Sequence, residues 1–203
     1  MYTREQVEKT MKAKGYKWFS DSKNKVYDVN IVGIRNSKTE NQVTNNFDDF
    51  LTISYKFEGN WKFNCWNVTT DPGQYWMEHP MNSGGCAILV PGQYRSAYKV
   101  GNHFDYEALR QQKPVKVYRD NDKDDIYDTD IDTITEGLYG INIHRSNPYT
   151  ESYYVDKWSA GCQVFKKVND FDTFMIICNK ARKIWGNSFT YTLLESQNIF
   201  ENV

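Results

Sequence analysis

A chain of 203 residues that is 39% hydrophobic and 16% aromatic can bury the core of one globular domain, which excludes wholesale disorder. Its formal net charge of −1 gives no general attraction to nucleic acid or to an anionic membrane, and no stretch is apolar over the length of a membrane span. We therefore expect neither a nucleic-acid partner nor a membrane span, and the oligomeric state stays open.

The first half of the chain predicts one helix followed by strands. Thr3 and Gln6 fit a capping box at the start of a helix over residues 3–15. Alternating β-branched residues then predict strands, the last two joined as a hairpin, over residues 27–35, 49–57 and 61–70.

The second half predicts more strands and one further helix. A Pro-Gly turn divides residues 84–101 into two strands, and shorter strands are expected over residues 115–120, 138–145 and 189–195. Apolar residues at helical spacing predict a helix over residues 169–186. The fold class expected is mainly β (α+β), with an N-terminal helix and lead-in over residues 1–28 and a single globular unit over residues 29–203.

The cysteines favour neither a disulfide framework nor a zinc site. Two disulfides are possible among Cys65, Cys86, Cys162 and Cys178, but nothing in the sequence indicates a secreted protein that would need them. No CxxC pair is present, so a zinc ribbon has no support. Cys178 lies on the apolar stripe of the predicted second helix and is expected in the core.

The stretch from Asp120 to Asp132 is the main compositional oddity. Asp120, Asp122 and Asp124 have the one-three-five spacing of a calcium-binding loop. The glycine expected at position six is absent, and Ile131 replaces the glutamate expected at position twelve. We therefore expect a solvated acidic loop rather than an EF-hand, with a weak cation site of another kind as the alternative.

One histidine and one cysteine stand eighteen residues apart, in "INIHR" and "SAGC". A cysteine nucleophile needs a base or an electropositive setting that favours its thiolate, and backbone amides directed at the oxyanion. Gly161 permits a tight turn in which amides near Cys162 converge, and a β-branched run delivers His144 at the end of a strand. These residues alone do not show that the two side chains meet.

The same segments resemble the catalytic motif of the L,D-transpeptidase (YkuD-like) family. In that family a histidine after a short strand precedes a Ser-x-Gly-Cys segment, as in "GINIHR" and "KWSAGCQVF". The stretch "TTDPGQYWM" is similar to a Thr-Pro-x-Gly turn that precedes the motif, and a helix and a strand follow the cysteine in both. The resemblance covers about residues 29–195 and implies an L,D-transpeptidase-like β-sandwich or barrel.

The resemblance also implies roles for individual residues. Cys162 would be the nucleophile, His144 the base that activates it, and Ser159 a residue that orients His144 by its hydroxyl or its carbonyl. The amides of Gly161 and Cys162 would form the oxyanion hole. The implied substrate is the stem peptide of bacterial peptidoglycan, the implied intermediate is a thioacyl-enzyme, and no metal or organic cofactor is implied.

Two positions depart from the family pattern. Arg145 stands where many members have glycine, and Val164 stands where many have an arginine or asparagine that helps to hold the substrate. Arg145 could replace that charge if the strand ends at His144, but a strand that continues through Arg145 would point it away from His144. Further candidate substrate contacts are His103, Tyr94 and Arg95.

Three functions stay open from the sequence. No export signal is visible near the N-terminus, which favours a phage endolysin-like lysis enzyme, made in the host cytoplasm and acting on the cell wall after release. We therefore prefer a peptidoglycan stem-peptide hydrolase. The alternatives are an L,D-transpeptidase that forms cross-links and an inactive wall-binding or virion structural protein. A papain-like protease is disfavoured because its cysteine precedes its histidine.

Overall fold

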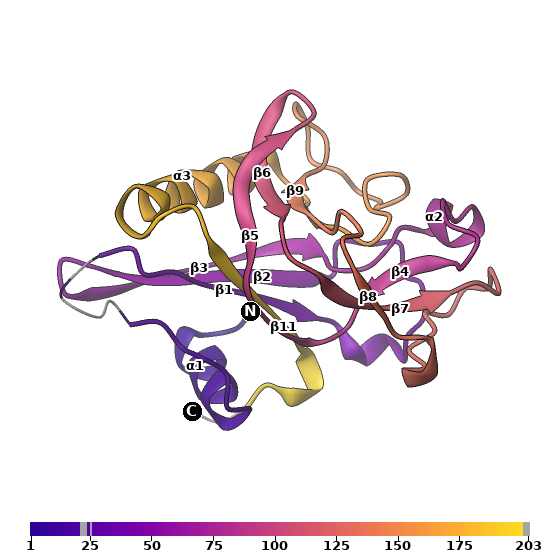
Figure 1. The fold of residues 1–203 in the computed structure, drawn as a ribbon, viewed down its shortest axis with the longest axis horizontal. Coiled ribbons are helices and arrows are strands. Elements are labelled where there is room, and N and C mark those ends of the chain that lie inside the picture. The colour runs from indigo at the N-terminus through magenta and orange to yellow at the C-terminus, as the bar shows by residue number, and fades with distance from the viewer. Residues whose placement is uncertain (21–23, 25, 201–203) are drawn as a thin grey trace.

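The computed structural model of the protein describes residues 1–20, 24 and 26–200. Within this range eight strands close into a barrel (Figure 1). In order around the barrel they are β1 (Asn30–Arg35), β11 (Phe189–Glu195), β5 (Gly92–His103), β6 (Tyr106–Gln111), β9 (Ile143–Arg145), β10 (Gln163–Phe165), β3 (Asn60–Thr69) and β2 (Asp49–Phe57). The mainly β, α+β class predicted from the sequence is confirmed.

A second, smaller antiparallel sheet stands beside the barrel. Its strands, in spatial order, are β4 (Cys86–Leu89), β7 (Val115–Asp120) and β8 (Thr135–Gly137). Figure 1 shows this sheet at the end of the molecule toward which β9 and the chain that follows it also run. The small sheet therefore borders the part of the barrel that carries the candidate motif.

Two helices agree with the sequence prediction. In α1 (Arg4–Ala13) the Gln6 N–H donates to Thr3 Oγ1 at 3.2 Å, and the Thr3 N–H donates to Gln6 Oε1 at 2.9 Å, so the capping box is formed. The second, α3 (Val168–Trp185), ends at Gly186, whose φ of +90° suits glycine. A short helix that was not predicted, α2 (Gln74–Glu78), has only five residues, too few for a helical period to show.

The remaining differences concern short strands. The strand expected over residues 138–145 is confined to β9, and β6, β8 and β10 were not predicted. Strands of three residues contain a single alternation, so periodicity cannot reveal them. β6 has the sequence YEALRQ, rich in helix-forming residues, and pairing with β5 overrides that local preference.

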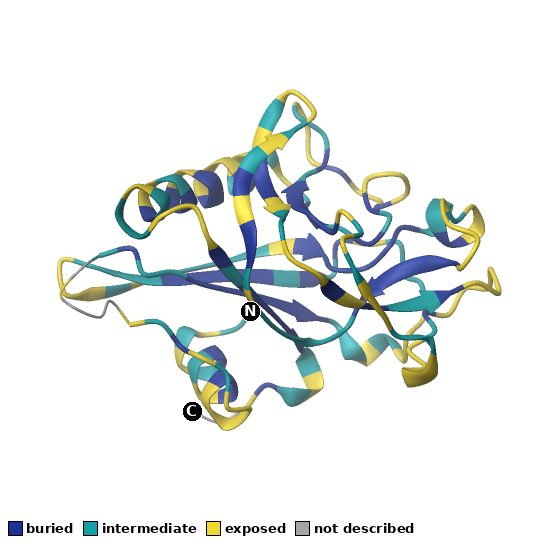
Figure 2. Cartoon of the chain, viewed as in Figure 1, coloured by how far each residue is buried: buried dark blue, intermediate teal, exposed yellow. Residues whose placement is uncertain are grey.

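The two long helices lie on opposite sides of the barrel strands (Figure 1). Phe171, Phe174 and Cys178 of α3 join the main core cluster with residues of the barrel and of the small sheet, and Cys178 is fully buried as expected. Val7 and Met11 of α1 pack in a separate cluster with outward-facing residues of β1 and β11. Figure 2 shows the buried strands between α1 and α3. In the described part of the chain, no helix combines the length and apolarity that crossing a bilayer requires.

Candidate active site

β9 and β10 are parallel neighbours; β9 carries the histidine, and the cysteine immediately precedes β10. Val164 is the register partner of His144. Alternate residues share a face of a strand, so Cys162 shares the face of Val164 and His144, and Cys162 indeed packs against Val164. Two residues of rise and one strand spacing separate the two Cα atoms by about 8 Å, which a thiol and an imidazole can span when they lean together.

The thiol of Cys162 is half-buried and lies between two backbone groups. It donates to the carbonyl oxygen of Gly140 at 3.3 Å, and the Asn142 N–H donates to the sulfur at 3.4 Å. Burial raises the pKa of Cys162 to about 11, and the Asn142 N–H opposes that shift. At neutral pH Cys162 is therefore a thiol. A cysteine nucleophile, as expected from the sequence, would need a setting that favours the thiolate.

His144 is buried in the tautomer that a base requires. It is 6% exposed, and its Nδ1 lies 2.8 Å from the carbonyl oxygen of Arg145. A carbonyl oxygen only accepts, so Nδ1 carries the proton and Nε2 is the basic nitrogen. Burial lowers the pKa of His144 to about 4, and the charge on His103 adds to the shift. The imidazole is neutral at pH 7 and is able to take up a proton.

Side chains of the β5–β6 hairpin cover His144. His103, the last residue of β5, stacks on it with ring centroids 4.4 Å apart. The hydroxyl of Tyr106, the first residue of β6, lies 3.5 Å from His144 Nδ1, and Cys162 is close enough to raise the pKa of Tyr106 electrostatically, after burial as the main cause. Tyr106 therefore contacts His144 and senses the charge of Cys162, although the sequence did not single it out.

Arg145 remains at this site even though β9 continues through it. Its guanidinium lies 4.0 Å above the ring of Tyr106, and its NH1 donates to the Ser146 carbonyl at 3.3 Å. Its charge lowers the pKa of His103, where burial is the larger cause and Arg110 also contributes. The guanidinium of Arg145 thus lies on the ring of Tyr106, and Tyr106 in turn contacts His103 and His144.

Ser159 organises the turn that presents the cysteine. Its buried hydroxyl donates to the Cys162 carbonyl at 2.8 Å and accepts from the Gly161 N–H at 3.1 Å, and its carbonyl accepts from the Gly73 N–H at 2.8 Å. The structure thus shows Ser159 bonded to the turn and not to His144. With the Gly161 N–H engaged, the Cys162 N–H, which has no hydrogen-bond partner among the described residues, is the amide left for an oxyanion.

Only glycine fits at position 161. Its φ is +116°, and a Cβ there would lie 2.2 Å from the carbonyl oxygen of Ala87 in β4. The cysteine turn therefore packs directly on the small sheet. The glycine identified from the sequence is required for this close approach as well as for the turn.

A buried ion pair anchors the turn that carries Gly73. Arg35 Nε lies 2.7 Å from Asp71 Oδ1, and the guanidinium also donates to the Thr70 carbonyl at 3.1 Å. Asp49 accepts from the N–H and the hydroxyl of Thr70 at 2.6 and 2.9 Å. Burial raises the pKa of both carboxyls, and Arg35 opposes this at Asp71, which makes Asp71 its ion partner. In the sequence, the sign of this network is Arg35, the charged residue that ends the strand NIVGIR.

A pocket of about 310 Å³ borders the cysteine turn. Ala160, two residues before Cys162, is part of its wall. Trp76, Arg119 and Tyr139 supply apolar and charged surface around it. A volume of this order matches small ligand sites, so the pocket offers room for a short peptide segment beside Ala160.

Tyr94 and Arg95 are not brought to the histidine and cysteine. They lie near the start of β5, eight or nine residues from His103, which is about 27 Å along an extended strand. Both line a different pocket, of about 670 Å³, and the Tyr94 hydroxyl donates to the Val90 carbonyl at 2.5 Å. Their role in substrate binding stays a prediction, and among the described residues neither contacts His144 or Cys162.

The assembled groups suit nucleophilic acyl transfer. Neighbouring segments carry a neutral imidazole with a free Nε2, on β9, and a thiol with an unengaged amide N–H, immediately before β10. All four cysteines are free, so the thiol of Cys162 is not consumed in a disulfide. The sequence missed Tyr106, for which the available signal was its place three residues after His103 across a tight turn, in "HFDY".

Comparisons with protein-family models, with curated proteins and with solved structures gave no match to this chain. The resemblance to L,D-transpeptidases therefore rests on the motif residues themselves. The functional conclusion is drawn from those residues and from the geometry around them.

Proposed function

We propose that the protein is a cysteine peptidase of the L,D-transpeptidase type that hydrolyses stem peptides of bacterial peptidoglycan, as a phage endolysin-like enzyme. The observation that carries the proposal is the placement of Cys162 and His144 on one face of adjacent parallel strands, with His144 Nε2 unprotonated. The closed barrel with α3 and β11 after the cysteine is compatible with the L,D-transpeptidase-like fold that the motif implies.

The proposed reaction begins from the neutral thiol. The sulfur of Cys162 attacks the peptide carbonyl carbon while the thiol proton passes to His144 Nε2, and the Cys162 N–H donates to the developing oxyanion. The C–N bond then breaks, His144 returns the proton to the leaving amine, and a thioacyl-enzyme remains. Water attacks this thioester with His144 again as base, which releases the acid and restores the thiol.

Charge and exposed aromatic surface around the site suit a carboxylate-bearing peptide. The half-exposed guanidinium of Arg145 can pair with a substrate carboxylate. Aromatic side chains that are 62 to 89% exposed lie on the turn after β5 and on the β9–β10 connection; they are Phe104, Tyr149, Tyr153 and Tyr154. Such faces bind apolar parts of a ligand.

Transpeptidation uses the same thioacyl-enzyme with an amine in place of water. The half-buried Cys162 is open to both acceptors, so the preference for hydrolysis rests on the sequence interpretation. The inactive wall-binding alternative predicts binding without turnover. A single experiment separates hydrolysis, transpeptidation and binding without turnover.

The test is mass spectrometry of stem-peptide fragments incubated with the protein in water enriched in oxygen-18, with and without an added D-amino acid. Hydrolysis is expected to place the heavy oxygen in the new carboxyl group and to stop in Cys162→Ala and His144→Ala. Matched controls are Cys65→Ala, a half-buried cysteine of β3, and His79→Ala, an exposed histidine. Both controls should keep wild-type turnover.

Other outcomes redirect or end the proposal. Products that carry the D-amino acid and no heavy oxygen identify a transpeptidase. Wild-type turnover in either motif variant removes the Cys162–His144 pair from the mechanism. Fragments that bind but stay unchanged in every sample support the wall-binding alternative.

A further inference from the structure

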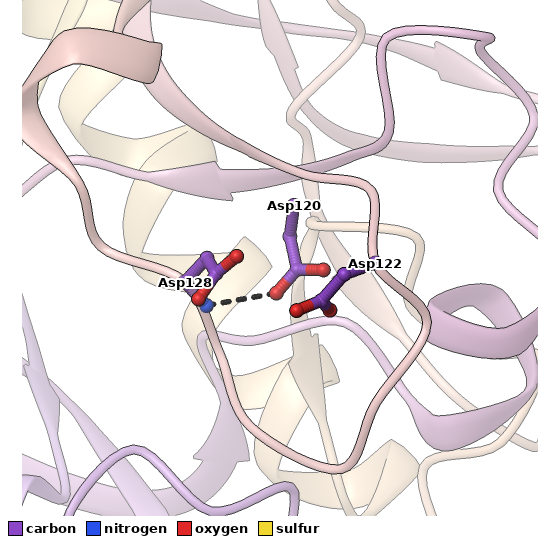
Figure 3. A group of neighbouring side chains, drawn as sticks. All are labelled: Asp120, Asp122 and Asp128. Atoms are coloured by element: carbon purple, nitrogen blue, oxygen red, sulfur yellow. Dashed lines mark hydrogen bonds between the residues drawn. The ribbon is translucent and has the colours of Figure 1, made fainter.

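Three aspartates gather at the end of β7, outside the candidate active site. Asp120 is the last residue of β7, and single carboxylate oxygens of Asp120, Asp122 and Asp128 all lie within 4.8 Å of one another. Figure 3 shows the carboxylates of Asp120 and Asp122 directed toward each other and the backbone of Asp128 closing the loop onto them. Exposed acidic clusters are common, so this proximity alone does not define a site.

The second observation is the state of Asp120. The residue is only 1% exposed. Its Oδ2 accepts from the Asp128 N–H at 2.8 Å, but its buried Oδ1 has no hydrogen-bond partner among the described residues. A buried carboxylate oxygen without a donor is costly, and it is rare in proteins unless an ion or water satisfies it. Asp120 Oδ1 belongs to a carboxylate that has an oxygen within 4.8 Å of carboxylate oxygens of Asp122 and Asp128.

Among the described residues, no basic side chain forms an ion pair with Asp120, Asp122 or Asp128. The charges that act on Asp120 are the carboxylates of Asp128, Asp122 and Asp124. The nearest basic side chain in sequence, Arg119, donates instead to the Gly85 carbonyl and the Thr135 hydroxyl and lies over the Tyr139 ring. The cluster therefore presents uncompensated negative charge around a desolvated oxygen.

A reversed backbone and a local hydrogen bond hold the loop between Asp122 and Asp128. Lys123 has a left-handed φ of +65° that reverses the chain, and Asp124 Oδ1 accepts from the Ile126 N–H at 2.7 Å. The carbonyl of Ile126 and the second oxygen of Asp124 extend the one-three-five-seven-nine spacing that runs from Asp120 to Asp128. No helix flanks the loop on its N-terminal side, where β7 ends, so it is not an EF-hand.

We propose that Asp120, Asp122 and Asp128 form a Ca²⁺ site. Calcium takes six to eight oxygens at about 2.3–2.6 Å, so opposite ligands lie up to about 5 Å apart, and the three carboxylates already fall within that span. Magnesium requires a tighter octahedron at about 2.1 Å and keeps several waters, which fits this spacing less well. Further ligands come from the loop and from water.

The site connects to the cysteine turn through two hydrogen bonds. Tyr127, next to Asp128, is buried and donates from its hydroxyl to the Pro72 carbonyl at 2.7 Å. The following residue, Gly73, donates to the Ser159 carbonyl at 2.8 Å. A bound Ca²⁺ that orders the loop therefore also holds the turn on which the cysteine segment rests.

The test is titration of metal-free protein with CaCl2 and, separately, MgCl2, followed by calorimetry and by thermal unfolding. One Ca²⁺ per chain is expected, with a rise in Tm of roughly 5 °C or more once free Ca²⁺ exceeds the Kd about a hundredfold. Asp120→Asn and Asp122→Asn should each weaken Ca²⁺ binding at least about tenfold. Asp125→Asn, the same charge change in the same loop but outside the cluster, should bind like the wild type.

Several results would overturn the assignment. One is the lack of any heat or Tm shift at about 10 mM CaCl2, which is above the weakest protein calcium sites. Another is binding that Asp122→Asn, an exposed substitution that should not impair folding, leaves unchanged. Equal affinity for Mg²⁺ would remove the assignment to calcium. None of these readouts depends on enzyme activity, so they are independent of the proposed function.

Discussion

The Nδ1 atom of His144 lies 2.8 Å from the carbonyl oxygen of Arg145, the next residue of the same strand. This contact within one short strand fixes which nitrogen carries the proton and leaves Nε2 as the base. Because the imidazole is also buried, its pKa falls to about 4. Local backbone geometry and burial thus set the protonation state from which any chemistry at Cys162 starts.

The first prediction is a loss of stability in mild acid that depends on His144. Its pKa is about 4 when folded and 6.5 in its ordinary state, so the unfolded chain binds the proton more tightly. The stabilisation is complete above pH 6.5 and is lost as the pH falls toward 4, by about 3 kcal/mol in total. Urea unfolding at pH 7 and pH 4.5 should show a smaller pH dependence in His144→Asn than in the wild type or in His79→Asn. Equal pH dependence in all three would contradict it.

The second prediction concerns alkylation of Cys162. Because burial raises its pKa to about 11, the iodoacetamide rate should rise about tenfold per pH unit between pH 7 and 10. His144→Ala should leave this rate nearly unchanged while it abolishes turnover. Peptide mapping of the alkylated protein gives the rate for each cysteine. Fast labelling of Cys162 that is already constant below pH 7 would indicate a preformed thiolate–imidazolium pair instead.

The third prediction separates two roles for Ser159. Ser159→Ala leaves the Gly161 N–H and the Cys162 carbonyl without their bonds to the hydroxyl, which should cost about 1–3 kcal/mol of unfolding free energy. We expect kcat to fall roughly tenfold to hundredfold with little change in KM, because the thiol is misplaced. The pKa of His144, measured by NMR titration, should be the same as in the wild type. A shift in its pKa would restore the role in orienting His144 that the sequence suggested.

The fourth prediction tests the buried ion pair. Arg35→Ala leaves Asp71 buried without its partner and should lower the unfolding free energy by about 3–5 kcal/mol. Arg95→Ala, which removes an exposed arginine of β5, should change it by less than about 0.5 kcal/mol. Chemical denaturation at pH 7 measures both. If Arg35→Ala lowers the unfolding free energy as little as Arg95→Ala does, the ion pair does not hold the Asp71 turn.

The fifth prediction links calcium affinity to pH. Burial raises the pKa of Asp120 from 3.8 to about 6, and neighbouring carboxylates add to the shift. Metal-free folded protein therefore keeps a proton between these values that the unfolded chain releases, so its stability falls as pH rises through this range. Calcium binds the ionised form, and its Kd at pH 5 should be about tenfold weaker than at pH 7.5. Calorimetry at pH 5 and pH 7.5 measures the Kd for calcium. A Kd that does not depend on pH would exclude Asp120 as a ligand.

The longer elements could be predicted from sequence because each carries its own signal. The capping box of Thr3 and Gln6 marks α1, and sustained alternation marks β2 and β11. β9 and β10 have three residues each and exist because their neighbours pair with them. Such strands depend on contacts distant in sequence, which a pattern within the strand cannot show.

The same limit applied to the candidate site. His144 and Cys162 could be named because "GINIHR" and "KWSAGCQVF" resemble the catalytic motif of the L,D-transpeptidase family. Tyr106 and the stacking of His103 on His144 depend on the β5–β6 hairpin folding over β9, and the state of the thiol depends on burial. The free oxygen of Asp120 likewise appears only when packing around β7 is known.

The position of β11 bears on how the protein is synthesised. β11 lies between β1 and β5 and pairs with both. β1 therefore cannot complete its pairing in the barrel before β11 is available. Closing a loop of this length is slow and comes late in folding. A nascent chain that has not yet released β11 from the ribosome has two open sheet edges, which favour aggregation. Barrel closure, and with it a rigid β9–β10 pair, is thus delayed until β11 has been synthesised and has left the ribosome.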